Sequence, residues 1–177
     1  MRKCILCLTI ALFIVGIGKA QEFEVGTNVI NAGIGFGGYY GFSIGSGVSE
    51  SPVFSVSYER GIWDIPGPGV VSLGGFFGRK TFEFDDAFGN DLNWSYTTIG
   101  FRGAYHYTGL EVENLDVYGG VMVHYDIFSG DDFDDYDSRP SATPFVGARW
   151  FFGDSFAAFA EGSYGVAFLT LGASFRF

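Results

Sequence analysis

The sequence predicts an all-β fold: an eight-stranded antiparallel up-and-down β-barrel whose strands cross a membrane. Segments of about ten residues alternate between apolar and small or polar side chains, which is the pattern of a tilted transmembrane strand. Aromatic residues make up 19% of the chain and there are 28 glycines, without any helical period. After residue 20 no apolar run reaches the ~20 residues of a membrane-spanning helix.

The last stretch, 166–177, shows this alternation most clearly. Successive side chains of a strand point to opposite faces, so the stretch has two rows. One row is apolar and comprises Ala167, Leu169, Leu171, Ala173, Phe175 and Phe177. The other row comprises Phe168, Thr170, Gly172, Ser174 and Arg176. We expect the apolar row to contact lipid and the other row to face the inside of the barrel.

The N-terminus has the composition of a secretory signal peptide. Arg2 and Lys3 precede an apolar run over 4–17, and small residues stand at positions −3 and −1 of a cut after Ala20. The run is shorter than a spanning helix needs. The sequence therefore predicts a cleavable signal peptide over 1–20 and an outer-membrane β-barrel domain over 21–177.

Charge and cysteine content exclude several classes of function. Removal of 1–20 takes away three basic residues and no acidic one, so the net charge changes from −10 to −13. A chain this acidic lacks the basic footprint of nucleic-acid binding. Both cysteines lie within 1–20, which excludes a disulfide framework and thiolate chemistry in the exported chain.

Eight alternating segments follow one another along the chain. We expect strands over 25–38, 52–63, 70–84, 94–107, 115–128, 142–152, 155–161 and 166–177. Short turns are expected over 64–69, 108–114 and 153–154, and longer outer connections over 39–51, 85–93 and 129–141. The fourth outer connection, 162–165, is short. An even number of strands places both termini on one side, and the difference in loop length is typical of such barrels.

The first three segments alternate with one irregularity. In 25–38 apolar side chains alternate with Asn31 and glycines, and in 52–63 they alternate with serines and Glu59. In 70–84 the parity switches at Phe82 and Phe84. We therefore predict a β-bulge, or the membrane boundary, near Lys80.

The remaining segments carry aromatic side chains near their ends and charges on one face. Tyr105 and Tyr107 close the apolar row of the fourth segment, as expected at a membrane interface. The charged row supplies a predicted lumen network of Glu59, Arg102, His106, Asp116, His124, Asp126, Arg149, Glu161 and Arg176. Eight strands enclose a space that side chains can fill, so we expect a packed polar plug and not an open pore.

Chemistry in this network is not expected. The turn near Glu111 pairs His106 with Asp116 or Tyr118, which places His124 about 20 Å away at ~3.3 Å per residue. The two histidines then cannot share a metal ion, and His106 beside Asp116 lacks a nucleophile. We find no Asp/His or Ser/His cluster near the outer rim, so we expect no catalytic residue, no cofactor, no metal and no enzymatic activity.

The connection 129–141 contains a candidate interaction loop. Its centre comprises Asp131, Asp132, Phe133, Asp134, Asp135, Tyr136 and Asp137. It lacks the turn glycine and closing glutamate of an EF-hand. A solvated, self-repelling loop is the simpler interpretation, while binding of calcium or a cationic extracellular partner is the alternative.

The C-terminal residues also resemble a known signal. Thr170, Gly172, Phe175 and Phe177 resemble the C-terminal signal of bacterial outer-membrane β-barrels, and the exported chain resembles the small OmpX/OmpA-type family. The resemblance implies insertion into outer-membrane lipid by the barrel-assembly machinery. It also implies a structural or surface-interaction role, such as adhesion or envelope integrity. The alternatives are a small gated channel or porin-like pathway, an outer-membrane enzyme acting on lipid or peptide, and a soluble periplasmic β-barrel.

Overall fold

A computed structural model describes residues 23–38, 48–85, 91–130 and 138–177. Nine strands lie within these residues and every pairing between them is antiparallel. They are β1 (Asn28–Phe36), β2 (Val48–Glu50), β3 (Val53–Ile65), β4 (Gly69–Asp85), β5 (Asp91–Tyr107), β6 (Leu115–Gly130), β7 (Arg139–Phe151), β8 (Phe156–Ser163) and β9 (Leu169–Arg176).

The strands close into a barrel whose wall has eight strands, if the short β2 is counted with β3. The hydrogen-bonded order is β2-β4-β3-β1-β9-β8-β7-β6-β5, and a further pairing of β4 with β5 closes the sheet. The short strand β2 also pairs with β4, and the Ser51 backbone N–H donates to the Thr81 carbonyl. β2 therefore continues β3 beyond the interruption at Pro52, which cannot donate to the ladder. The predicted fold class is confirmed.

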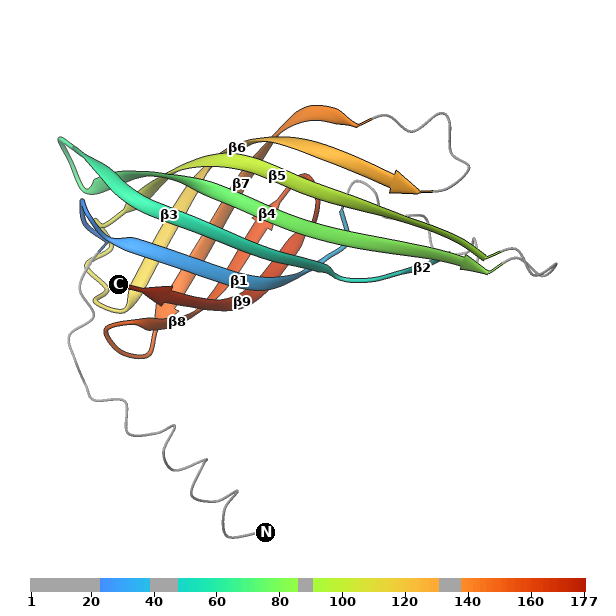
Figure 1. Cartoon of the computed structure of the whole chain (residues 1–177). Coiled ribbons are helices and arrows are strands. Elements are labelled where there is room, and N and C mark those ends of the chain that lie inside the picture. Colours follow the sequence, from blue (N-terminus) through green and yellow to red (C-terminus); the bar gives the residue numbers. More distant parts are fainter. Residues whose placement is uncertain (1–22, 39–47, 86–90, 131–137) are drawn as a thin grey trace, which may run out of the picture.

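The strands extend further beyond the barrel body at one end than at the other (Figure 1). The C-terminus lies at the same end as the turn between β3 and β4 and the link between β7 and β8; we call this the terminal end. At the opposite end, which we call the loop end, β4 and β5 extend furthest from the barrel body.

The predicted bulge near Lys80 is wrong. β4 and β5 pair without a shift from Gly69↔Tyr107 to Asp85↔Asp91. Lys80 and Phe82 keep the inward parity and are buried. The large apolar side chain of Phe82 misled the parity argument because it lies inside the barrel, stacked on the Trp94 ring with the ring centres 5.2 Å apart.

The real irregularity lies in β3. Its pairing with β4 shifts between Gly61 and Trp63.

Two other expectations, on the start of the last strand and on the long connections, also change. β9 begins at Leu169 and not at 166, and just before it the side chain of Ala167 is buried while that of Phe168 is exposed, the reverse of the predicted rows. The strands β5, β6 and β7 and the short β2 occupy parts of the predicted long connections.

The two faces of the wall have the predicted polarity. Val121, Leu169 and Phe175 are 52%, 44% and 41% exposed on the outside, whereas Arg102 and Arg149 are 3% and 0% exposed inside. A soluble barrel with an apolar lumen would show the reverse arrangement, so that alternative is contradicted. No helix among the described residues has the length and apolar character needed to span a membrane.

Candidate functional site

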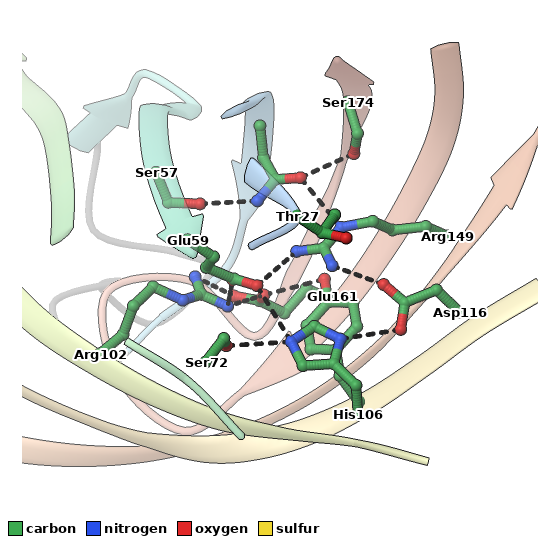
Figure 2. A network of polar contacts seen from close by, with 12 residues as sticks. Thr27, Ser57, Glu59, Ser72, Arg102, His106, Asp116, Arg149, Glu161 and Ser174 are labelled. Atoms are coloured by element: carbon green, nitrogen blue, oxygen red, sulfur yellow. Dashed lines mark hydrogen bonds and ion pairs between the residues drawn. The ribbon is translucent and has the colours of Figure 1, made fainter. Parts of the chain in front are cut away.

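Arg149 spans the lumen from one wall to the opposite one. It rises from β7, where its Nη2 donates to Glu59 Oε2 on β3 at 2.9 Å and its Nη1 donates to Asp116 Oδ2 on β6 at 2.7 Å. Its Nε donates to Asn31 Oδ1 on β1 at 3.1 Å. Figure 2 shows the guanidinium between the two carboxylates. Because β3 lies four strands from β7 around the wall, this contact crosses the barrel axis.

Arg102 makes the second crossing. Its Nη2 donates to Glu161 Oε2 on β8 at 2.6 Å, and the same nitrogen lies 2.9 Å from Glu59 Oε1. The contact with Glu59 is an ion pair without hydrogen-bond geometry, since Glu59 Oε1 and Arg102 Nε have no hydrogen-bond partner. The Phe145 ring lies under the guanidinium, 4.0 Å from its carbon. Two arginines thus share three carboxylates in the middle of the barrel, where low dielectric strengthens each attraction.

Small residues make room for these long side chains. A Cβ atom added to Gly147 would lie 2.5 Å from the Tyr118 hydroxyl oxygen. The hydroxyl of Tyr118 donates to Glu161 Oε2 at 3.1 Å, and the Tyr118 ring lies 4.1 Å from the guanidinium carbon of Arg149. The glycines that alternate with charges in the sequence therefore give space to the lumen network.

His106 belongs to this central network. Its Nδ1 lies 2.8 Å from Asp116 Oδ1 and its Nε2 lies 2.9 Å from the Ser72 hydroxyl (Figure 2). The sequence predicted the Asp116 partner but missed Ser72, which reaches His106 because β4 and β5 pair side by side. Phe23 covers the other side of the ring in a stacked contact, with 3.6 Å between ring centres. The Ser72 and His106 side chains are fully buried.

Residues before β1 seal the terminal end, which the sequence did not predict. The Gly26 N–H donates to the Gly61 carbonyl at 2.9 Å, and the Gly61 N–H donates to the Thr27 carbonyl at 3.0 Å. A Cβ atom at Gly61 would lie 2.3 Å from the Glu24 carbonyl oxygen, so only glycine allows this approach. The bulge in β3 thus provides the docking point for residues 23–27, and the first of them, Phe23, is only 4% exposed.

A separate polar group lies toward the loop end. His124 Nδ1 lies 3.1 Å from Asp126 Oδ1, and His124 Nε2 lies 3.0 Å from the Thr143 hydroxyl. Thr98 also donates to Asp126 Oδ1, at 2.5 Å. The sequence did not anticipate a His/Asp/hydroxyl cluster here. The β6–β7 register, which pairs Met122 with Thr143, creates it.

The structure buries all nine residues of the predicted lumen network, in three groups. Glu59, Arg102, His106, Asp116, Arg149 and Glu161 form the central group, and His124 and Asp126 form the second. Arg176 lies at the terminal end, where its Nε donates to the Asp154 carbonyl at 2.8 Å. No group of three or more His, Cys, Asp and Glu side chains placed to hold a metal ion occurs within the described part of the chain. The candidate interaction loop, 131–137, lies outside the described residues.

The four residues that resemble the assembly signal lie on or beside β9. Phe175 and Phe177 are exposed on the apolar side, and Thr170 and Gly172 are half-buried. A Cβ atom at Gly172 would lie 2.1 Å from the Ala32 carbonyl oxygen, so this glycine permits the close pairing of β9 with β1 that closes the barrel.

Comparisons with known proteins agree with this architecture. A designed transmembrane β-barrel is 12% identical with a TM-score of 0.55, covering 89% of this chain and all of its own. The attachment invasion locus protein Ail of Yersinia pestis, solved with the heparin analogue sucrose octasulfate, is 18% identical with a TM-score of 0.54, covering 87% of this chain and 100% of its own. The N-terminal β-barrel domain of Pseudomonas aeruginosa OprF is 16% identical with a TM-score of 0.50, covering 86% and 98%.

These likenesses show the fold. The chain has the fold of the small transmembrane β-barrels, and the resemblance to OmpX/OmpA-type barrels holds at this level. No protein-family model matches the sequence, and no curated protein matches it at a significant level.

Proposed function

We propose that this protein is an integral bacterial outer-membrane β-barrel with a structural or surface-interaction role, exercised through its loop end. The observation that carries the proposal is the polarity of the barrel wall, whose outer face is apolar and whose inner face is charged, the reverse of a soluble barrel with an apolar lumen. An apolar exterior around a charged lumen is stable when lipid surrounds the barrel, because lipid solvates the outer side chains while the inner charges pair with one another.

The side chains that bridge the lumen favour a closed barrel and not a pathway for solutes. Arg149 and Arg102 connect opposite walls, and Phe23 covers His106 at the terminal end. Opening a path along the axis would separate buried ion pairs, which is costly. Planar-bilayer recordings should show no large, steady single-channel current. Such a current would favour the channel alternative.

The net negative charge of this chain favours a basic partner over an anionic one. Ail was solved with a sulfated heparin analogue, which is a polyanion. This chain has a net charge of −10, and residues 131–137 include five aspartates. Like charges repel, so a partner with a basic surface fits this chain better than a sulfated glycan does.

Cell-surface display tests the interaction role. Cells that display the protein should bind a basic probe such as polylysine, and replacement of the five aspartates of 131–137 by asparagine should lower binding. The matched control replaces Glu111 and Glu113, in the short link at the terminal end, by glutamine. Equal binding by both variants, or preferential binding of heparin, would contradict the proposal. Heat-modifiable gel mobility and membrane fractionation first establish a folded barrel in the outer membrane.

Assembly is proposed to depend on the C-terminal strand. Phe177 and Phe175 present their rings on the apolar side, with 5.9 Å between ring centres. Replacement of Phe177 by alanine should lower the fraction of folded barrel that cells insert, while leaving spontaneous folding into lipid vesicles nearly unchanged. An equal loss in both experiments would show that Phe177 contributes only to stability.

A further inference from the structure

His106 faces a carboxylate on each of its two ring nitrogens. Asp116 Oδ1 lies 2.8 Å from Nδ1, and Glu59 Oε2 lies 3.5 Å from Nε2, beside the Ser72 hydroxyl (Figure 2). A neutral ring has a single N–H, so one of its nitrogens would turn a lone pair toward a carboxylate. A ring with two protons presents an N–H to each carboxylate. The Ser72 hydroxyl fits either form because it can donate or accept, so the carboxylates decide in favour of the imidazolium.

The charges of the central group balance only if this ring is charged. Its three carboxylates carry three negative charges, whereas its two arginines carry two positive ones. Each carboxylate accepts from an arginine nitrogen at 2.6–2.9 Å, which is the short contact of a charge-assisted hydrogen bond. All these side chains are buried, where one uncompensated charge is costly. A second proton on His106 makes the central group neutral.

The contact between His106 and Phe23 points to the same charge state. The two rings lie face to face, with 3.6 Å between ring centres and 1° between ring planes. Two neutral aromatic rings prefer an offset or edge-on contact, because their negative faces repel each other. A cation over the face of a phenylalanine ring is instead attracted to it. The stack is therefore the arrangement expected of an imidazolium on a phenyl ring.

His124 has different surroundings. Asp126 lies at its Nδ1 and the Thr143 hydroxyl lies at its Nε2, so a carboxylate faces only one of its ring nitrogens among the described residues. It also borders a cavity of about 270 Å³ toward the loop end, whereas the His106 side chain is fully buried. The features that favour an imidazolium at His106 are thus particular to the central group.

We propose that His106 is a buried imidazolium that holds the seal formed by residues 23–27 in place, and that the seal opens when the ring loses its second proton. The side chains around the ring are Phe23 before β1, Glu59 on β3, Ser72 on β4, and Asp116 and Tyr118 on β6, with Arg149 of β7 bonded to both carboxylates.

Loss of the second proton acts on the seal in two ways. The central group gains one uncompensated negative charge, and the ring of Phe23 loses its cationic partner. Both changes destabilise the docked segment. The proton leaves as pH rises, so the seal is docked below the titration midpoint of His106 and released above it.

Nitrogen-15 NMR of the histidine rings tests the charge. Purified protein labelled with [15N]histidine is placed in lipid vesicles, and His124→Gln assigns the remaining signal to His106. At pH 8, where an unperturbed histidine is neutral, both nitrogens of His106 should carry protons. Glu59→Gln removes one facing carboxylate, so the titration midpoint should fall by about one pH unit or more. Ser72→Ala leaves both carboxylates in place and is the matched control. A single ring proton at pH 8, or an unchanged midpoint in Glu59→Gln, would overturn the proposal.

A spin label at residue 25 follows the seal. Val25 is 52% exposed, and Val25→Cys provides a single attachment site once Cys4 and Cys7 are replaced by serine. The label should be slow at pH 7 and mobile above the midpoint found by NMR. His106→Gln should release it at pH 7, whereas Ser72→Ala should follow the wild type. A label at Ile65→Cys, at the end of β3, should show no change with pH.

Heat-modifiable mobility shows whether each labelled variant is folded. A seal that stays docked after the His106 ring has lost its proton, or that stays docked in folded His106→Gln, would contradict the proposed role of the ring. These readouts concern the terminal end, so they are independent of the surface-interaction role proposed for the loop end.

Discussion

Replacement of Arg149 by methionine tests whether the central network holds the barrel together. Methionine is unbranched and apolar, so it fills much of the same space without a charge. The side chain of Arg149 is fully buried and makes three hydrogen bonds, two of them to carboxylates. Its removal leaves Glu59 and Asp116 in the lumen without their main counter-charge.

The structure sets the size of the expected effect. Two hydrogen bonds to charged groups contribute about 1.5–3 kcal/mol each. Breaking one partner out of a buried ion pair costs about 3–5 kcal/mol. Water that enters beside the unpaired carboxylates offsets a part of the loss, so we expect Arg149→Met to lower the free energy of unfolding by about 4 kcal/mol.

Urea titration in lipid vesicles measures this change. The three tryptophans, Trp63, Trp94 and Trp150, all lie in strands and report unfolding by fluorescence. Arg60→Met is the matched control, because Arg60 is exposed; its effect should stay within about 0.5 kcal/mol. A loss below about 1 kcal/mol for Arg149→Met would refute the argument that cross-lumen charges stabilise the barrel.

Neutralising the stranded carboxylates separates charge from packing. The triple variant Arg149→Met, Glu59→Gln, Asp116→Asn no longer buries uncompensated charge, so it should regain more than half of the lost stability. A triple variant as unstable as the single one would show that the shape of the arginine matters and its charge does not.

Three further perturbations follow from the seal and the outer wall. Phe23→Ala removes a buried ring stacked on His106 and should cost about 2 kcal/mol in the same urea titration; an unchanged midpoint would contradict the stacked seal. Gly61→Val places a branched side chain against the Glu24 carbonyl, so limited proteolysis should cut residues 23–27 faster than in the wild type, and equal protection would show that the segment docks elsewhere. Val121→Arg introduces a charge on the outward face of β6 and should cost about 2–4 kcal/mol in vesicles, against little change for Val121→Leu; a tolerated arginine would place that face away from lipid.

Alternation along the chain was enough to predict the wall of the barrel. The side-chain period of a strand is two, so each apolar row and each charged row could be assigned before any pairing was known. The parity argument failed at Phe82, because an aromatic ring can also fill the lumen of a narrow barrel. It failed again at Ala167 and Phe168, which precede β9 and are not bound to its alternation.

The candidate sites were less predictable for a geometric reason. A polar side chain in the lumen can contact residues on any of the eight strands of the wall, so its partner depends on register and on barrel closure. Arg149 meets Glu59 across the axis although 90 residues separate them in the chain. The register of β6 with β7 pairs His124 with Ser141. Thr143 reaches His124 because it lies two residues further along β7, on the same face as Ser141. Neither relation has a local signal.

The amino-acid order by itself determined the class of this protein: short alternating strands with an apolar row and a charged row, joined by glycine-rich turns. Those properties are local, because each depends only on neighbouring residues along one strand. The tertiary structure alone decided which charges pair across the lumen, how residues 23–27 seal the terminal end, and which histidine borders open space. Those outcomes depend on closure of the sheet, which brings together side chains that no sequence spacing connects.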